Sequence, residues 1–245
     1  IKTDLPYGRY YVQEIATDSH YKLSDAKYPI IFEYVGQDTA VVKIAVNDGK
    51  AIKNDLIYGS VSGKKVDEDG NALGGALIGL FRTDDGEFTK ENALMTTTSA
   101  EDGSFSFENI PCGTWYVREI EQPTGFVLDD TIYPVTIGTD GQVVEIEIVN
   151  EYGRGNIHLT KVDSEYPDNK LTGAVFEVYK DSNNNSKLDE GDELLGTLTE
   201  KEIGEYGMND LFYGRYFVKE TKAPDGFVLD TDVYEVVIDT DGKTY

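Results

Sequence analysis

Cysteine, histidine and tryptophan are scarce in this sequence, and basic residues are few relative to acidic ones. The one cysteine excludes an internal disulfide, and the two histidines, His20 and His158, are too few and too far apart for a zinc site. With 22 basic against 46 acidic residues, the net charge of −24 excludes nucleic acid as a partner and disfavours anionic membranes, because basic side chains bind phosphates. The acidity instead indicates a highly soluble surface.

Long apolar runs are also absent, and no stretch approaches the length that spans a bilayer. The sequence shows no signal peptide or sorting signal, no serine or cysteine in a nucleophile elbow, and no glycine-rich loop before a helix. Cys112 takes the place of a tyrosine in a repeated turn that has Tyr7 and Tyr213, so we expect it to be half-buried and inert. These absences predict a protein without turnover catalysis.

Internal repeats are the main positive feature. The segment DLPYGRYYVQEI at 4–15 recurs as NIPCGTWYVREI at 109–120 and as DLFYGRYFVKET at 210–221. A second segment, GSVSGKKVD at 59–67, recurs as GNIHLTKVD at 155–163. Spacings of about 100 residues are too long for a solenoid repeat and match whole domains in an array.

The repeats predict three units. Residues 1–55 are expected to form the back half of a first unit, residues 56–153 a complete unit, and residues 154–245 a unit that lacks its last strand. We expect the chain to be excised from a longer protein, because the repeats are cut at both ends. The short linker EYGRG favours an elongated rod over freely hinged domains.

The residue pattern predicts an all-β protein. Runs such as VVEIEIV, AVFEVY and VYEVVI alternate with period two, and EDGN, EDGS, TDGQ and TDGK each place a glycine where a tight turn needs positive φ. Several short strands per hundred residues, separated by such turns, are typical of a β-sandwich.

Several polar residues of the repeats occupy strand positions that face the same side as apolar residues. Lys65 and Lys161 each share a strand face with apolar residues, as do Glu14, Glu119 and Glu220 in the second repeat. Asparagines end strands in the same phase: Asn150 in the second unit and Asn54 in the first, with Asn47 a competing assignment in a segment that reads as a hairpin turn. Charged groups on a core-facing side are costly unless they are neutralised or bonded.

The chain resembles the B-type repeat domains of Gram-positive collagen adhesins and the SpaA-like pilin domains. The resemblance spans essentially all of the chain. It rests on an opening KVD strand, the strands GALIGLF and GAVFEVY, the YGRY motif with its glutamate, the blocks QPTGFVLD and APDGFVLD, and an asparagine that ends a strand. The resemblance implies tandem transthyretin-like (prealbumin-like) Greek-key β-sandwiches.

That family is known for a spontaneous isopeptide bond, and the polar residues above are the types that its chemistry needs. The resemblance implies a bond between Lys65 and Asn150 with Glu119 as the catalyst, because a desolvated lysine is nucleophilic and a buried glutamic acid can shuttle protons. The alternative is a buried Lys–Glu ion pair beside a hydrogen-bonded asparagine, which would gain little stability. The end units hold only partial sites: Glu14 and Asn54 in the first, Lys161 and Glu220 in the third.

The third unit also contains the segment DSNNNSKLDEGD at 181–192. Its oxygens fall at the positions of a calcium loop, from five side chains and one carbonyl: Asp181, Asn183, Asn185, Lys187, Asp189 and Asp192. Ser186 replaces the usual glycine, and Asp192 replaces the usual glutamate, although Glu193 is adjacent. The alternative is a solvated acidic turn, and no other cofactor is expected.

Together these features predict the rigid stalk of an adhesin or pilus-like protein on the cell wall of a Gram-positive bacterium. Its expected partners are the neighbouring domains of the array and, at a distal tip, a host surface protein or glycan. The alternative is a ligand-binding module for a host matrix protein or carbohydrate, which could depend on calcium. A binder should show clustered exposed aromatics, whereas the one tryptophan, Trp115, falls on a core-facing strand.

Overall fold

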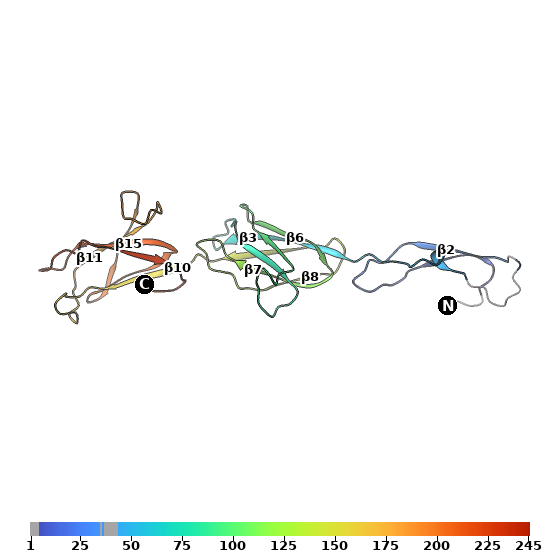
Figure 1. Ribbon diagram of the computed structural model, residues 1–245, viewed down its shortest axis with the longest axis horizontal. Helices are drawn as coiled ribbons and strands as arrows, with labels where there is room; N and C mark the ends of the chain where they lie inside the picture. The colour runs from blue at the N-terminus through green and yellow to red at the C-terminus, as the bar shows by residue number, and fades with distance from the viewer. Residues whose placement is uncertain (1–4, 35, 37–43) are drawn as a thin grey trace.

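The computed structural model describes residues 5–34, 36 and 44–245. These residues form three bodies arranged in a row along the long axis of the molecule, in the order of the sequence (Figure 1). The secondary structure is almost entirely β, which confirms the expected fold class. In the described part of the chain, no helix is both long and apolar enough to cross a bilayer.

The N-terminal body contains a two-stranded antiparallel sheet and one short 3₁₀ turn. Strand β1 (Gly8–Gln13) pairs with β2 (Lys27–Phe32), and η1 (Val46–Gly49) follows. Asn47, within η1, has a φ of +53°, as expected for a turn.

The middle body is a sandwich of two sheets. One has the order β6–β3–β9 and the other the order β5–β4–β7–β8. The strands are β3 (Tyr58–Asp67), β4 (Leu77–Phe81), β5 (Met95–Thr98), β6 (Ser104–Pro111), β7 (Gly113–Glu121), β8 (Tyr133–Ile137) and β9 (Val143–Asn150). The first and last strands, β3 and β9, are parallel neighbours, so the chain enters and leaves the sandwich at opposite ends.

Period-two alternation places one face of each strand in the core between these sheets. Val61, Phe105, Val117 and Ile148 are among the buried apolar residues, and Trp115 belongs to the same cluster at 5% exposure. The tryptophan therefore packs in the core, as its strand phase predicted.

The C-terminal body repeats this plan with its own core. Its sheets have the orders β10–β14–β13 and β12–β11–β15–β16. The strands are β10 (Arg154–Thr160), β11 (Val175–Lys180), β12 (Glu193–Thr197), β13 (Thr199–Glu202), β14 (Glu205–Phe212), β15 (Gly214–Lys222) and β16 (Val233–Ile238). Thr244 forms a parallel bridge with Asn156 of β10, at the place where β9 pairs with β3 in the middle body.

The two sandwiches bury separate apolar clusters, one drawn from residues between Val61 and Ile148 and the other from residues between Ile157 and Ile238. The division of the chain into units at 55/56 and 153/154 stays a prediction.

Candidate functional site

The three polar residues of the middle unit lie in its core. Lys65 on β3, Glu119 on β7 and Asn150 at the end of β9 have exposed fractions of 0%, 1% and 1%. Lys65 is paired with Ile148 in the parallel β3–β9 register, and Asn150 follows two residues later on the same face of the sheet. Glu119 belongs to the opposite sheet. Strand phase and register thus bring all three to one end of the sandwich interior.

Hydrogen bonds fix the carboxamide and the carboxyl. Asn150 Nδ2 donates to Glu119 Oε2 at 2.8 Å and to the carbonyl of Val127 at 2.5 Å. The backbone N–H of Asp129 donates to the same Glu119 oxygen at 2.8 Å. The Lys65 ammonium donates to the carbonyls of Ile148, at 3.1 Å, and of Val66, at 3.3 Å, so its nitrogen lies beside the strand that ends in Asn150.

Two buried oxygens of this cluster have no hydrogen-bond partner, namely Glu119 Oε1 and Asn150 Oδ1. A buried acceptor without a donor is costly, because it has lost its hydration without replacement. A proton on the Glu119 carboxyl would reduce that cost, because it turns one acceptor into a donor.

Burial moves both ionisable groups toward their neutral forms. It lowers the pKa of Lys65, against the opposing effect of the Glu119, Asp129 and Asp67 charges. It raises the pKa of Glu119, although hydrogen bonds from Asp129 and Asn150 act in the other direction. An amine that loses its proton readily and a carboxyl that keeps its proton are a nucleophile and a general acid beside an amide.

The N-terminal body contains the same pairing of glutamate and asparagine. Asn54 Nδ2 donates to both carboxylate oxygens of Glu14, at 2.8 and 2.9 Å, and the Ser24 N–H donates to Glu14 at 3.0 Å. The structure therefore brings Asn54 to Glu14, whereas Asn47 lies in the η1 turn. Glu14 is only half-buried, and the hydrogen bonds from Ser24 and Asn54 lower its pKa.

The C-terminal body pairs its lysine and glutamate directly. Lys161 Nζ lies 3.0 Å from Glu220 Oε1, and the Asp230 N–H donates to Glu220 Oε2 at 2.7 Å. The Glu220 side chain is fully buried, whereas the Lys161 side chain is 19% exposed.

One element of the site was missed from the sequence. In all three units the backbone N–H ten residues after the glutamate, from Ser24, Asp129 or Asp230, donates to the carboxylate. The last two residues are the aspartates of the repeated GFVLD block, and their side chains accept hydrogen bonds from Tyr133 and Tyr234. The contact with Asp230 raises the pKa of Tyr234 to about 12. The repetition of the block was the available signal.

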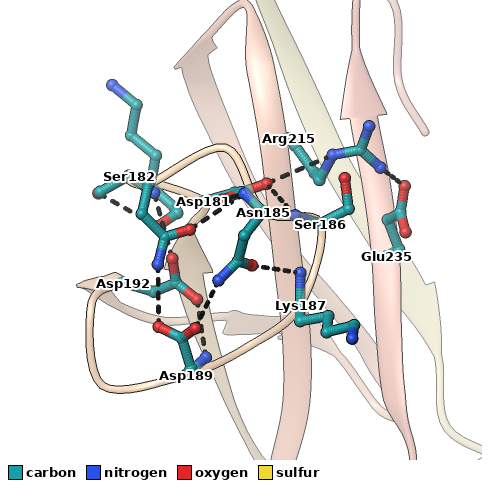
Figure 2. Close-up of polar contacts among 11 residues, drawn as sticks. Asp181, Ser182, Asn185, Ser186, Lys187, Asp189, Asp192, Arg215 and Glu235 are labelled. Atoms are coloured by element: carbon teal, nitrogen blue, oxygen red, sulfur yellow. Dashed lines mark hydrogen bonds and ion pairs between the residues drawn. The ribbon is translucent and has the colours of Figure 1, made fainter.

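The 181–192 loop is closed by its own polar groups (Figure 2). Asp189 accepts hydrogen bonds from the amides of Asn183 and Asn185, at 3.0 and 2.5 Å. Asp192 accepts from the backbone of Asp189 at 2.9 Å and from that of Ser182 at 3.2 Å. Asp189 is thus the central acceptor of the loop, and the amide oxygens of Asn183 and Asn185 accept instead from backbone N–H groups, those of Asn185 and Lys187.

The buried end of the loop is anchored to the sheet. Asp181, 5% exposed, accepts hydrogen bonds from the N–H groups of Asn185 and Ser186, and its carboxylate lies 3.4 Å from Arg215 Nε on β15. Arg215 also pairs with Glu235 (Figure 2). Ser186 has a φ of +61°, so the turn forms without the glycine that a calcium loop usually has there.

The fit of this loop to calcium depends on amide oxygens. Among residues 5–34, 36 and 44–245, no group of three or more His, Cys, Asp and Glu side chains is arranged to hold a metal. Rotating each asparagine amide by half a turn would present its oxygen where its nitrogen now lies, beside Asp189. Such a mixed set of carboxylate, amide and backbone oxygens is what calcium prefers.

Comparison with known proteins gives a family match over most of the chain. The family model of the SpaA prealbumin-like fold domain matches residues 59–152 and again residues 155–245. Prealbumin-like is the fold that the motifs implied.

Three individual proteins are also similar to the chain. The trypsin-resistant surface T6 protein of Streptococcus pyogenes is 35% identical over 80 residues, which are 33% of this chain and 13% of that protein. The TIE protein of Bacillus anthracis superposes with a TM-score of 0.68 at 25% identity, over 98% of this chain and 41% of that one. A streptococcal ancillary pilin is 26% identical over 98% of this chain and 75% of its own, with a TM-score of 0.38, too low to show a shared overall arrangement. The chain therefore spans less than half of the first two proteins.

The opposite environments of Glu119 and Glu14 give a testable difference. In a Lys65→Ala variant, which cannot cross-link, NMR titration should give Glu119 a pKa above the ordinary value and Glu14 a pKa below it. Burial dominates at Glu119, and loss of the lysine charge raises its pKa further, whereas donated hydrogen bonds dominate at half-exposed Glu14. Two carboxyls that titrate together, near the value of a free glutamic acid, would show that the described environments are wrong.

Proposed function

The chain belongs to the SpaA family of prealbumin-like fold domains, and on that premise we propose that it is a stalk segment of a Gram-positive surface adhesin or pilus, stiffened by an isopeptide bond between Lys65 and Asn150. The family is a structural one, so its domains are not enzymes. The bond would form once per molecule, with Glu119 as an internal catalyst.

The observation that carries the proposal is the burial of Lys65, Glu119 and Asn150 together in one core. In the reaction, the neutral Lys65 amine attacks Asn150 Cγ, and a new C–N bond forms as the bond from Cγ to Nδ2 breaks. Glu119 protonates the departing nitrogen and regains a proton from the lysine, so the products are a secondary amide and ammonia. Each group needs the protonation state that burial favours. The positioned carboxamide supplies proximity, which lowers the barrier further.

The position of the bond suits a stalk that bears tension. It would join β3 to β9, the first and last strands of the sandwich, which are parallel neighbours. Force entering at Tyr58 would pass from Lys65 to Asn150 and into the following linker, and the chain between residues 66 and 149 would carry little of it. Without the bond, the tension would be resisted only by the backbone hydrogen bonds between β3 and β9, which would be loaded in shear.

A ligand-binding role for this segment has less support. Trp115 is in the core, so it cannot form part of an exposed aromatic binding surface. We propose instead that contacts with a host surface protein or glycan belong to a distal tip, and that this segment contacts neighbouring domains of the same array. The location that follows is the bacterial cell surface, with the stalk anchored to the cell wall.

We also propose that the 181–192 loop binds calcium weakly. Its support is the spacing of oxygen-bearing side chains along the loop, the hydrogen bonds that bring the Asn183 and Asn185 amides to Asp189, and the positive φ of Ser186. Calcium would rigidify the connection between β11 and β12, which lies on the surface of the third unit.

The cross-link predicts a change in mass. The intact protein should weigh less than its sequence by one ammonia, and Glu119→Ala should restore the full mass because the proton shuttle is lost. Glu14→Ala is the matched control, since it removes the corresponding glutamate of the first unit, which is half-buried, and should leave the shortfall unchanged. A wild-type mass equal to the sequence mass would show that the cross-link does not form.

The cross-link also predicts a difference in stability. Trp115 is the one tryptophan, so its fluorescence reports melting of the middle unit alone. Lys65→Ala should lower that melting temperature by roughly 15 °C or more, because a cross-link closing a loop of this size contributes on the order of 4 kcal/mol through the unfolded state. Lys161→Ala should leave the tryptophan signal unchanged. An unaltered transition in Lys65→Ala would remove the structural role of the bond.

Calcium binding is tested by NMR. Titration should shift the side-chain amide signals of Asn183 and Asn185 in the range of about 0.1–1 mM that is typical of extracellular calcium modules. The amides of Asn71 and Asn92 in the middle unit serve as internal controls, and Asp189→Ala should abolish the shift. If the loop amides stay put throughout the titration, the segment is a solvated acidic turn.

A further inference from the structure

The linker between the middle and third units is hydrogen-bonded to both of them. Five bonds hold residues 151–154: Val127 N to Glu151 O at 2.9 Å, Gly153 N to Gly125 O at 2.9 Å, Tyr213 N to Gly153 O at 2.8 Å, Gly242 N to Arg154 O at 2.8 Å, and Arg154 N to Asp241 Oδ1 at 3.1 Å. The first two come from the GFVLD block of the middle unit, and the other three come from the third unit. Residues 151–154 are therefore held by hydrogen bonds from both units, and we call this segment the second joint.

The same five bonds recur at the junction between the first and middle units. They are Lys22 N to Asp55 O at 2.8 Å, Ile57 N to His20 O at 2.9 Å, Cys112 N to Ile57 O at 3.0 Å, Gly141 N to Tyr58 O at 2.8 Å, and Tyr58 N to Asp140 Oδ1 at 3.4 Å. We call residues 55–58 the first joint. Because the whole set of hydrogen bonds recurs at corresponding positions, the joint is a feature of the repeat.

The two joints differ in which of two corresponding positions carries the larger side chain. At the second joint, Gly153 faces Tyr213, and a Cβ on Gly153 would lie 2.2 Å from the tyrosine ring. At the first joint, Ile57 takes the place of the glycine and Cys112 that of the tyrosine. A large residue on one side is thus matched by a small one on the other, which accounts for the cysteine in the repeated turn.

Aromatic and charged groups complete the second joint. The Tyr152 ring stacks on Phe126 of the middle unit at 4.8 Å between centroids and meets the edge of Phe212 of the third unit at 5.2 Å. Arg154 lies over Phe212 at 5.1 Å and forms an ion pair with Glu68. Tyr152 and Arg154 therefore each contact both the middle unit and the third unit.

The joint shares its residues with the cross-link site. Val127, whose N–H binds the linker, is also the residue whose carbonyl accepts from the Asn150 carboxamide. The Tyr152 hydroxyl donates to Asp67 at 2.8 Å, and Asp67 is the register partner of Asn150 on β3. Tyr152 follows Asn150 by two residues, so whatever holds the linker also holds the end of β9.

We propose that the third unit, docked on this joint, positions the Asn150 carboxamide for attack by Lys65, so that cross-linking of the middle unit is coupled to the folding of the unit after it. The inference rests on the cross-link of the proposed function. Without the docked unit, the residues after Asn150 lose three of the five joint bonds and the contact with Phe212. The end of β9 would then fray, and amide attack tolerates little displacement of the reacting atoms.

The test uses a glycine substitution that touches the joint and none of the three reacting side chains. The full chain is made by cell-free synthesis, translation is stopped, and loss of ammonia is followed by intact mass over time. Gly153→Ala should slow that loss by about tenfold to a hundredfold, because its Cβ drives Tyr213 away from the linker. Gly138→Ala is the matched control, since its Cβ has no neighbour nearer than 3.9 Å, and it should react at the wild-type rate.

A rescue variant separates positioning from general damage. Gly153→Ala combined with Tyr213→Cys, measured in reducing buffer, copies the small residue of the first joint and should restore fast cross-linking. Trp115 fluorescence shows in each variant whether the middle unit has folded. A folded Gly153→Ala variant that reacts at the wild-type rate, or a slow one that the second substitution does not rescue, would overturn the coupling. Wild-type protein that never loses ammonia would instead overturn the proposed function.

Discussion

The burial of a lysine, a glutamate and an asparagine in one sandwich core is the constraint on which the middle unit depends. Lys65 and Glu119 are both desolvated, and burial favours the neutral form of each. As a bare ion pair they would gain little over apolar residues of the same size. Converting the amine and the carboxamide into a neutral amide would remove the charge on the lysine permanently. The buried polar groups and the proposed resistance to tension would then both follow from the placement of these three residues.

The topology of the strands would give the proposed bond a mechanical role. Because β3 and β9 are parallel neighbours, the two linkers leave opposite ends of the sandwich, and a bond between these strands lies directly between them. The joints extend the same logic along the rod. Each linker is bonded to the unit before it and to the unit after it, and the bonds repeat from one junction to the next. A row of stiff units would still bend at loose joints, so the hydrogen bonds at each linker would be needed for the proposed stalk in addition to the cores.

Part of this architecture follows from the sequence alone. Strand alternation predicts which side chains share a face, and this alone predicts that Lys65, Glu119 and Asn150 face the core. The contacts that hold them depend on turn geometry and on register between distant segments. The N–H of Asp129 reaches Glu119 because of the path of the GFVLD block, and no local pattern reports that path. Ser186 shows the same limit in another form, since the turn imposes a positive φ on a residue that disfavours it. The difference in side-chain size between the two joints leaves one trace in the sequence, namely Cys112 in place of a tyrosine.

The most direct test of the cross-link is to sequence it. Proteolysis of the native protein followed by tandem mass spectrometry should yield one branched peptide, in which the chain around Lys65 is joined through its side chain to the chain around Asn150, with one ammonia lost. Fragment ions on either side of both residues would fix the bond to those two positions. Recovery of the two segments as separate linear peptides, with a free lysine at 65 and an intact asparagine at 150, would contradict the account.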